Sequence, residues 1–404
     1  MDTNSNQARR VVIGITAHVD AGKTTLAEAM LYRTGRLRKL GRVDHGSAAM
    51  DSHLLERERG ITIFSSQAEL PIGDLEVTLL DTPGHVDFSA EMERTLSVLD
   101  YAILVISGAD GVQAHTRTLW RLLELYRIPT FLFVTKMDFG RCGRGQMMEH
   151  LRHELGEGCV DFTPADRERR MEQLATCRED ALEAYLDGGE VPDALVRQLV
   201  GRRLVFPCWF GSGLKLEGID EFLEGLARYV QPPVYPETFS ARVFKISHDP
   251  QGKRLTHLKV TGGTLRVRDA VSYAGHQEKA AQLRIYSGGR FRAVDQVPAG
   301  GVCAVQGLTA TCGGQGLGGG GIRRPAGAGA GDALSGGPAA GLRQPHPAAP
   351  AAPVGGGGPS AALHLPRRRN SCVPDGPHPG GNSQKPGVGA LRRGDRAGPG
   401  PGFV

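Results

Sequence analysis

The sequence AHVDAGKT at residues 17–24 most constrains the fold, because it stands between an apolar run and a helical pattern. It fits the pattern G-x-x-x-x-G-K-[ST], except that Ala17 replaces the first glycine. In such a loop the main-chain N–H groups and the start of the next helix face phosphate oxygens, Lys23 adds a positive charge and Thr24 binds Mg²⁺. The alternative interpretation is an ordinary glycine-bearing turn between a strand and a helix.

Apolar runs alternate with helical patterns through the first half of the chain. The runs that predict buried strands are residues 11–16, 76–80, 102–106, 130–134 and 204–209, and those that predict helices are 24–33, 116–126 and 218–229. This alternation predicts an α/β domain, a mostly parallel sheet with helices on both faces. We expect this domain at residues 10–232, with a charged helical insert at about residues 139–203.

The pattern changes after a proline-containing linker at residues 231–234. Short β-type runs separated by Gly, Asp and Pro predict an all-β barrel domain at residues 238–311. Residues 313–404 contain 26 Gly and 14 Pro and predict a disordered low-complexity tail. We interpret this tail as a GC-rich reading frame translated out of phase, so that the chain is truncated after its second domain. The rival interpretation is a genuine low-complexity tail.

The distribution of charge and the spacing of the cysteines bear on the possible binding partners and on the cellular compartment. The tail carries a net charge of +7 and the rest of the chain −2, so the pI near 8.8 does not indicate a nucleic-acid-binding folded part. The seven cysteines form no C-x-x-C pair, which favours free thiols in a reducing compartment. Because there is no signal-peptide core and no 18-residue apolar stretch, we expect a cytoplasmic protein that does not bind membranes.

Two further motifs supply candidate metal ligands. The sequence DTPGH at residues 81–85 follows an apolar strand, where Asp81 could hold Mg²⁺ through water and the N–H of Gly84 could approach the γ-phosphate. In RGITI at residues 59–63, the hydroxyl of Thr62 could also reach Mg²⁺. Taken alone, the first motif could be a turn and the second the start of a strand.

A fourth motif, TKMD at residues 135–138, suggests which nucleotide base the site recognises. The Asp138 carboxylate could accept two hydrogen bonds from the N1–H and N2–H₂ edge of guanine, which adenine does not offer. An ATP-using P-loop kinase is the disfavoured alternative.

With these motifs in place, the chain resembles translational GTPases of the elongation factor G class, and within it the tetracycline-resistance ribosomal protection proteins. Besides the motifs above, GRVD (41–44), LLER (54–57), LSVLD (96–100) and DGVQA (110–114) carry the match, which covers about residues 10–318. The resemblance implies ribosome-stimulated hydrolysis of GTP to GDP and phosphate by a monomer that acts on ribosomal RNA and proteins. It also implies Mg²⁺, with a monovalent cation as a further candidate.

The resemblance also implies roles for single residues. His85 would position the attacking water, Asp20 and Gly60 would lie near the charge that neutralises the phosphates, and Ser212 would pack on guanine. We interpret His18 as part of the loop structure rather than as a catalytic residue. Gly213 stands where the family usually has Ala. Thr135 stands where it usually has Asn, so we expect guanine binding that is weakened rather than absent. The full expected set of GTP contacts is Ala17, His18, Val19, Asp20, Ala21, Gly22, Lys23, Thr24, Gly60, Asp81, Thr82, Pro83, Gly84, His85, Thr135, Lys136, Met137, Asp138 and Ser212.

The sequence leaves several functions open. The first is a ribosomal-protection GTPase whose drug-release activity is impaired because the family's later domains are missing. The second is an elongation or peptide-chain release factor with the same fold. The third is a GTP-binding remnant that does not hydrolyse its nucleotide. The first and the third both predict GTP binding, and only the first predicts phosphate release.

Overall fold

A computed structural model describes residues 9–38, 66–82, 89–139, 142–163 and 167–319. Most of the tail expected at 313–404 therefore lies outside the described residues. The described helices are α1 (Lys23–Arg33), α3 (Ser89–Leu96), α4 (Ala114–Leu125), α5 (Arg144–Leu155), α6 (Arg167–Thr176), α7 (Glu179–Gly188), α8 (Asp193–Gly201) and α9 (Ile219–Tyr229).

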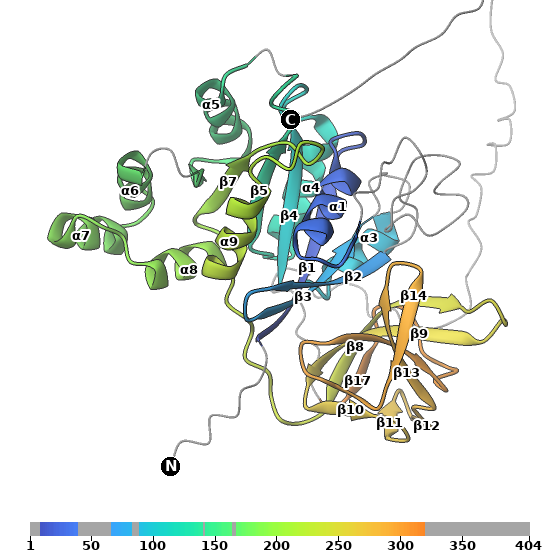
Figure 1. Cartoon of the computed structure of the whole chain (residues 1–404). Coiled ribbons are helices and arrows are strands. Elements are labelled where there is room, and N and C mark those ends of the chain that lie inside the picture. The colour runs from blue at the N-terminus through green and yellow to red at the C-terminus, as the bar shows by residue number, and fades with distance from the viewer. Residues whose placement is uncertain (1–8, 39–65, 83–88, 140–141, 164–166, 320–404) are drawn as a thin grey trace, which may run out of the picture. The chain divides into compact units, whose positions relative to one another are not determined.

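The described strands fall into two groups along the chain (Figure 1). The first group is β1 (Arg9–Ala17), β2 (Ser66–Ile72), β3 (Leu75–Asp81), β4 (Tyr101–Ser107), β5 (Thr130–Thr135), β6 (Cys159–Asp161) and β7 (Phe206–Phe210). The second is β8 (Ser240–His248), β9 (Arg254–Gly262), β10 (Thr264–Arg266), β11 (Ala270–Tyr273), β12 (His276–Lys279), β13 (Gln282–Ser287), β14 (Arg290–Val294), β15 (Gln296–Pro298), β16 (Val302–Gln306) and β17 (Gly316–Gly318).

The first group forms one sheet in the order β2-β3-β1-β4-β5-β7-β6. Only β2 runs antiparallel to its neighbour, and the remaining neighbours are parallel. The predicted α/β domain with a mostly parallel sheet is therefore confirmed. Parallel neighbours require crossover connections, and the helices that make them cover both faces of the sheet (Figure 1).

Alternate residues of each central strand enter different cores. Along β4, Ile103 and Val105 join a core built with α1 and α9, whereas Leu104 and Ile106 join a core built with α3, α4 and α5. This follows from the two-residue period of a strand, which sends successive side chains to opposite faces. Because both faces are covered, these strands appear in the sequence as continuous apolar runs.

The helical insert belongs to the same sheet. Helices α5 to α8 fall within the expected range of about 139–203, and between them β6 pairs in parallel with β7 at the sheet edge. Leu174 of α6 and Val196 of α8 are buried in the same core as α1 and α9. The insert is thus packed onto the α/β domain through its own apolar positions.

The second group forms an antiparallel β domain, as expected. Its main sheet has the order β14-β13-β16-β9-β8-β17, and two short ladders join β10 to β15 and β11 to β12. One core, which includes Val243, Leu258 and Leu283, fills this domain. Strand β17 pairs with β8, so the sheet continues past residue 311, where the sequence placed its boundary.

The described ranges contain eight helices and six cysteines. None of these helices is long and apolar enough to cross a membrane. The six cysteines that fall within the described residues are all free thiols, in agreement with the sequence analysis.

Candidate nucleotide-binding site

The first loop of the α/β domain has the geometry of an anion-binding turn. Ala17 is the last residue of β1, is fully buried and pairs with Val105 of β4. The chain then turns, with the N–H of Ala21 bonded to the carbonyl of His18 at 3.2 Å. Gly22 follows with φ 92°, a left-handed conformation that favours glycine, and α1 begins at Lys23. The loop therefore aims the N-terminus of α1 at the carboxyl edge of the sheet.

The start of α1 is left available for an anion. Gly22 provides no side-chain cap, and the first turn holds no acidic residue. The unpaired N–H groups of a helix N-terminus and the helix dipole together attract negative charge. Val19 is half-buried and Asp20 exposed beside this end. The ring of His18 lies 6.0 Å from that of His115, between centroids.

A buried ion pair joins the loop to the neighbouring strand. The Lys23 ammonium donates to the carboxylate of Asp81, which ends β3 and is fully buried. The next residue, Thr82, is buried too and binds the Ile15 carbonyl through both its hydroxyl (2.9 Å) and its N–H (3.1 Å). Lys23 and Asp81, which come from two separate sequence motifs, are thus brought into direct contact.

The donors at this edge fit Mg²⁺. Thr24, half-buried at the start of α1, and Asp81 offer hard oxygen ligands. The described residues hold no cluster of three or more His, Cys, Asp or Glu side chains suited to a metal. Mg²⁺ is typically bound through one or two protein oxygens together with phosphate oxygens and water. The donor set therefore suits a magnesium ion that arrives with a nucleotide, and not a closed structural metal site.

The last residue of β5 and the residue that follows it hold the phosphate loop in place through hydrogen bonds. The Thr135 hydroxyl, which is buried, donates to the Ala21 carbonyl at 2.5 Å. Lys136 has φ 56°, and its ammonium donates to the Asp20 carbonyl at 2.6 Å. Thr135, which departs from the family pattern, thus keeps a polar link to the loop. Sequence reasoning did not find the Lys136 contact, because it joins residues 116 positions apart.

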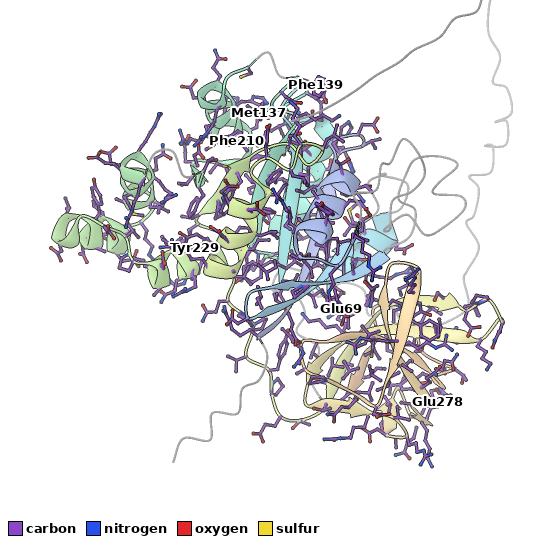
Figure 2. All side chains as sticks on the ribbon, in the orientation of Figure 1. Glu69, Met137, Phe139, Phe210, Tyr229 and Glu278 are labelled. Carbon is purple, nitrogen blue, oxygen red and sulfur yellow. The ribbon has the colours of Figure 1, made fainter. Side chains whose placement is uncertain are left out.

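Asp138 faces a partner that sequence reasoning also missed. The Lys215 ammonium lies 2.9 Å from the Asp138 carboxylate. Hydrogen bonding from Lys215 lowers the pKa of Asp138, so the carboxyl group is ionised at neutral pH and can accept hydrogen bonds. Nothing in the sequence distinguishes Lys215 from a solvated lysine. Met137, Phe139 and Phe210 can be located in Figure 2 near the ends of β5 and β7.

The loop that follows β7 also lies at the site, close to the first turn of α1. Ser212 is buried and exchanges two backbone hydrogen bonds with Glu217, at 3.0 and 3.1 Å. A Cβ atom on the next residue, Gly213, would come within 3.2 Å of the backbone of Thr25 and Leu26. The departure from Ala to Gly at this position therefore accompanies a close approach of the loop to α1.

The remaining predicted site residues fall outside the described ranges. These are Gly60, Thr62, Pro83, Gly84 and His85. Among the described residues, the loop at 17–24, the end of β3, the segment after β5 and the loop after β7 meet at one edge of one sheet. This edge is formed by the carboxyl ends of parallel strands, where ligands bind in open α/β sheets.

A parallel α/β sheet with this loop defines a P-loop nucleotide-binding domain. The family model described as "Elongation factor Tu GTP binding domain" matches residues 8–232, and the one described as "Elongation factor G domain 2" matches residues 238–316. The chain belongs to the family of the elongation factor Tu GTP binding domain.

Similar proteins of known name include resistance proteins. An oxytetracycline resistance protein of Streptomyces rimosus is 37% identical, with 73% of this chain and 50% of the relative covered. The tetracycline resistance protein TetO of Campylobacter jejuni is 32% identical, with 70% and 47% covered. A crystal structure of a Thermus thermophilus protein matches with a TM-score of 0.71 at 26% identity, over 78% of this chain and 55% of that one. The chain spans about half the length of these curated relatives.

Proposed function

We propose that the chain binds GTP with Mg²⁺ and hydrolyses it on the ribosome, as a translation factor of the tetracycline ribosomal-protection type. The observation that carries the proposal is the contact of Lys23 with Asp81 beside an uncapped helix N-terminus. The names of the resistance proteins that are similar over about 70% of this chain support the protection class.

The proposed chemistry divides the work among a few groups. The N–H groups of the loop and Lys23 neutralise and position the phosphates, while Thr24, Thr62 and Asp81 hold the metal. Mg²⁺, when bound, supplies positive charge to the β- and γ-phosphate oxygens. Asp138 and Ser212 select and pack against guanine. His85 orients the attacking water once the ribosome has ordered the site.

The proposal assigns each part of the chain a task. Residues 10–232 act as the GTP-binding domain, residues 238–311 with the strand that follows act as the β domain, and the tail from residue 313 takes no part in catalysis. We further propose that the chain is monomeric and cytoplasmic, that a monovalent cation lies near Asp20 and Gly60, and that the ribosome is its partner.

The experiment compares GTP hydrolysis by the full chain with and without ribosomes. We expect ribosome-stimulated phosphate release that falls by about two to three orders of magnitude in His85→Ala, with GTP affinity unchanged. GTP binding without stimulated phosphate release would instead support a non-hydrolysing remnant. Absence of GTP binding would overturn both.

Drug release is tested separately from hydrolysis. A ribosome that is stalled by tetracycline and rescued by this chain supports the protection role. Stimulated hydrolysis with rescue of a drug-free elongation or release defect would point to the elongation or release alternative.

A further inference from the structure

The helical insert contains a cavity that shares no residue with the nucleotide site. It has a volume of about 340 Å³ and is lined by residues of α5, β6 and α6. Its polar lining consists of Arg144, Arg152, Arg169, Arg170, Asp161 and Gln173. Four arginines and one aspartate line this described part of the cavity, and Arg169 among them already takes part in an interaction of its own.

The one carboxylate in this lining is already engaged. One oxygen of Asp161 accepts from Nε of Arg144 at 2.5 Å, and the other accepts from the N–H of Thr163 at 2.9 Å. The guanidinium carbon of Arg144 also lies 5.5 Å from the ring centroid of Phe210, which is labelled in Figure 2. Arg144 is therefore fixed at one side of the cavity, and the Asp161 carboxylate, engaged by Arg144, leaves a net positive charge from Arg152 and Arg170.

Two further arginines are oriented by neutral partners. Nε of Arg152 donates to the Cys159 carbonyl at 3.1 Å, and Nη1 of Arg170 donates to the Phe162 carbonyl at 3.3 Å. The guanidinium carbon of Arg170 lies 5.5 Å from the ring centroid of Phe162. Carbonyl groups and aromatic rings hold a guanidinium in place and leave its full charge and most of its five N–H donors for another partner.

The cavity also holds buried polar atoms without a partner. Among the described residues, neither Nε of Arg170 nor Oε1 of Gln173 has a hydrogen-bond partner, and both atoms are buried. The oxygen and nitrogen of a glutamine amide are interchangeable in such assignments, so Gln173 can present N–H donors to the cavity. Buried polar groups are nearly always paired, and an unpaired one calls for a ligand or water.

We propose that this cavity is a binding site for a phosphate group. A tetrahedral oxyanion would receive bidentate hydrogen bonds from fixed guanidinium groups, which match phosphate geometry better than a lysine ammonium does. It would also offset the positive charge of Arg152 and Arg170. The volume exceeds that of one phosphate, since a water molecule takes about 30 Å³ of liquid. The phosphate therefore comes either from the backbone of an RNA strand or from a free phosphorylated small molecule.

The test uses the full chain saturated with GDP and Mg²⁺, so that the nucleotide site is filled. Inorganic phosphate is titrated in by calorimetry, in a buffer without other oxyanions. We expect saturable binding that is weakened about tenfold in Arg152→Gln and in Arg170→Gln, since each removes one charged donor pair. Arg202→Gln is the matched control, because Arg202 is an exposed arginine of the same insert that does not line the cavity. Circular dichroism and GDP affinity confirm that each variant is folded.

Each result of the binding measurements either supports or overturns the proposed phosphate site. Fluorescence anisotropy with a labelled single-stranded RNA forms a second arm. RNA binding that weakens in the same two variants and not in Arg202→Gln assigns the phosphate to a nucleic-acid backbone. Phosphate binding that depends on the variants while RNA binding does not assigns it to a small molecule. No saturable phosphate binding, equal weakening in Arg202→Gln, or arginine-dependent binding of an oligoglutamate peptide alone would overturn the proposal.

Discussion

The phosphate loop and the junction between the two domains each bury a lysine–aspartate pair, but the pairs differ in their surroundings. Lys23 and Asp81 have side-chain exposures of 10% and 0%, and Lys259 and Asp100 of 4% and 8%. Burial alone therefore does not separate them. The two pairs differ instead in whether a ligand could take the place of one of the two side chains.

The junction pair is embedded in further protein contacts. Lys259 of β9 donates to Asp100 at 2.6 Å and to the Val98 carbonyl at 3.0 Å. The Asp100 carboxylate also accepts from the Val12 N–H at 2.8 Å and from the Tyr235 hydroxyl at 3.4 Å. Burial, and then the charge of Asp100, raise the pKa of Tyr235, which stays protonated and able to donate. These contacts link β1, β4 and β9 across the domain junction, so this pair is structural.

The loop pair lies where a ligand can replace either partner. Lys23 stands at the N-terminus of α1 and Asp81 at the end of β3, both at the carboxyl edge of the sheet. Under the proposed function, an incoming phosphate would attract the ammonium and a magnesium ion would attract the carboxylate. The comparison therefore suggests that the pair at the helix N-terminus can give way to a ligand, whereas the pair at the junction serves the fold.

The largest expected effect is on stability at the junction. Lys259→Met removes the ammonium and leaves Asp100 buried without its cation, which should lower the free energy of unfolding by about 3–5 kcal/mol. Urea denaturation measures this, and GTP affinity of the folded fraction should stay unchanged. In the matched control, Lys259→Met combined with Asp100→Asn, most of the stability should return. If the single variant is as stable as the parent, the pair is not structural and the comparison fails.

The next effect is on nucleotide binding at the loop. Lys23→Ala should weaken GTP binding at least a hundredfold, or about 2.7 kcal/mol, because the phosphates lose their point charge. Lys253→Ala, an exposed lysine of the β domain, is the control and should bind GTP like the parent. Equilibrium binding of a fluorescent GTP analogue measures both. Equal affinity in Lys23→Ala and Lys253→Ala would remove Lys23 from the phosphate site.

A buried histidine near the junction pair gives the third effect, on acid stability. Burial, aided by the charge of Lys245, lowers the pKa of His257 to about 3, against an ordinary value of 6.5. Between these two values the unfolded chain binds a proton that the folded chain does not. The free energy of unfolding should therefore fall as pH drops below 6.5, by up to about 1.4 kcal/mol per pH unit. Above pH 6.5 this histidine has no effect.

The histidine's share can be separated from that of the carboxylates. Urea denaturation at pH 7.5 and pH 5 is compared for the parent and for His257→Gln, whose amide can still pair with Ser247, 2.8 Å from the ring in the parent. The variant should lose less stability on acidification than the parent. The same loss in both proteins would show that His257 is not the group that titrates.

The two domains were predictable from the sequence to different degrees. The central strands β4 and β5 were found because both faces of each are buried and the apolar runs are continuous, and β1 and β3 because most of their residues are buried. Strand β6 was missed because three residues are too short to show a period. Strand β2 was missed because it contains Pro71 and lies at a sheet edge. The short strands β10 and β15 of the β domain depend on pairing between distant segments.

The site was predictable where one short segment carries the chemistry. Lys23, Asp81 and Asp138 follow strands and belong to compact motifs, so their common edge could be inferred before the fold was known. The contacts of Lys136 with Asp20 and of Lys215 with Asp138 were not predictable. They depend on side chains from separate loops meeting in space, and lysines in such loops are normally solvated.

The smallest expected effect concerns the departure at Thr135, which contacts the loop that holds Lys23. Thr135→Val keeps the shape of the side chain and removes the hydroxyl that donates to the Ala21 carbonyl at 2.5 Å. One lost buried hydrogen bond is worth about 1 kcal/mol, so GTP affinity should fall about fivefold. Thr135→Ser keeps the hydroxyl and should bind GTP like the parent. Parental affinity in Thr135→Val would mean that the loop holds its shape without this bond, and that the pair of Lys23 and Asp81 is sufficient to order it.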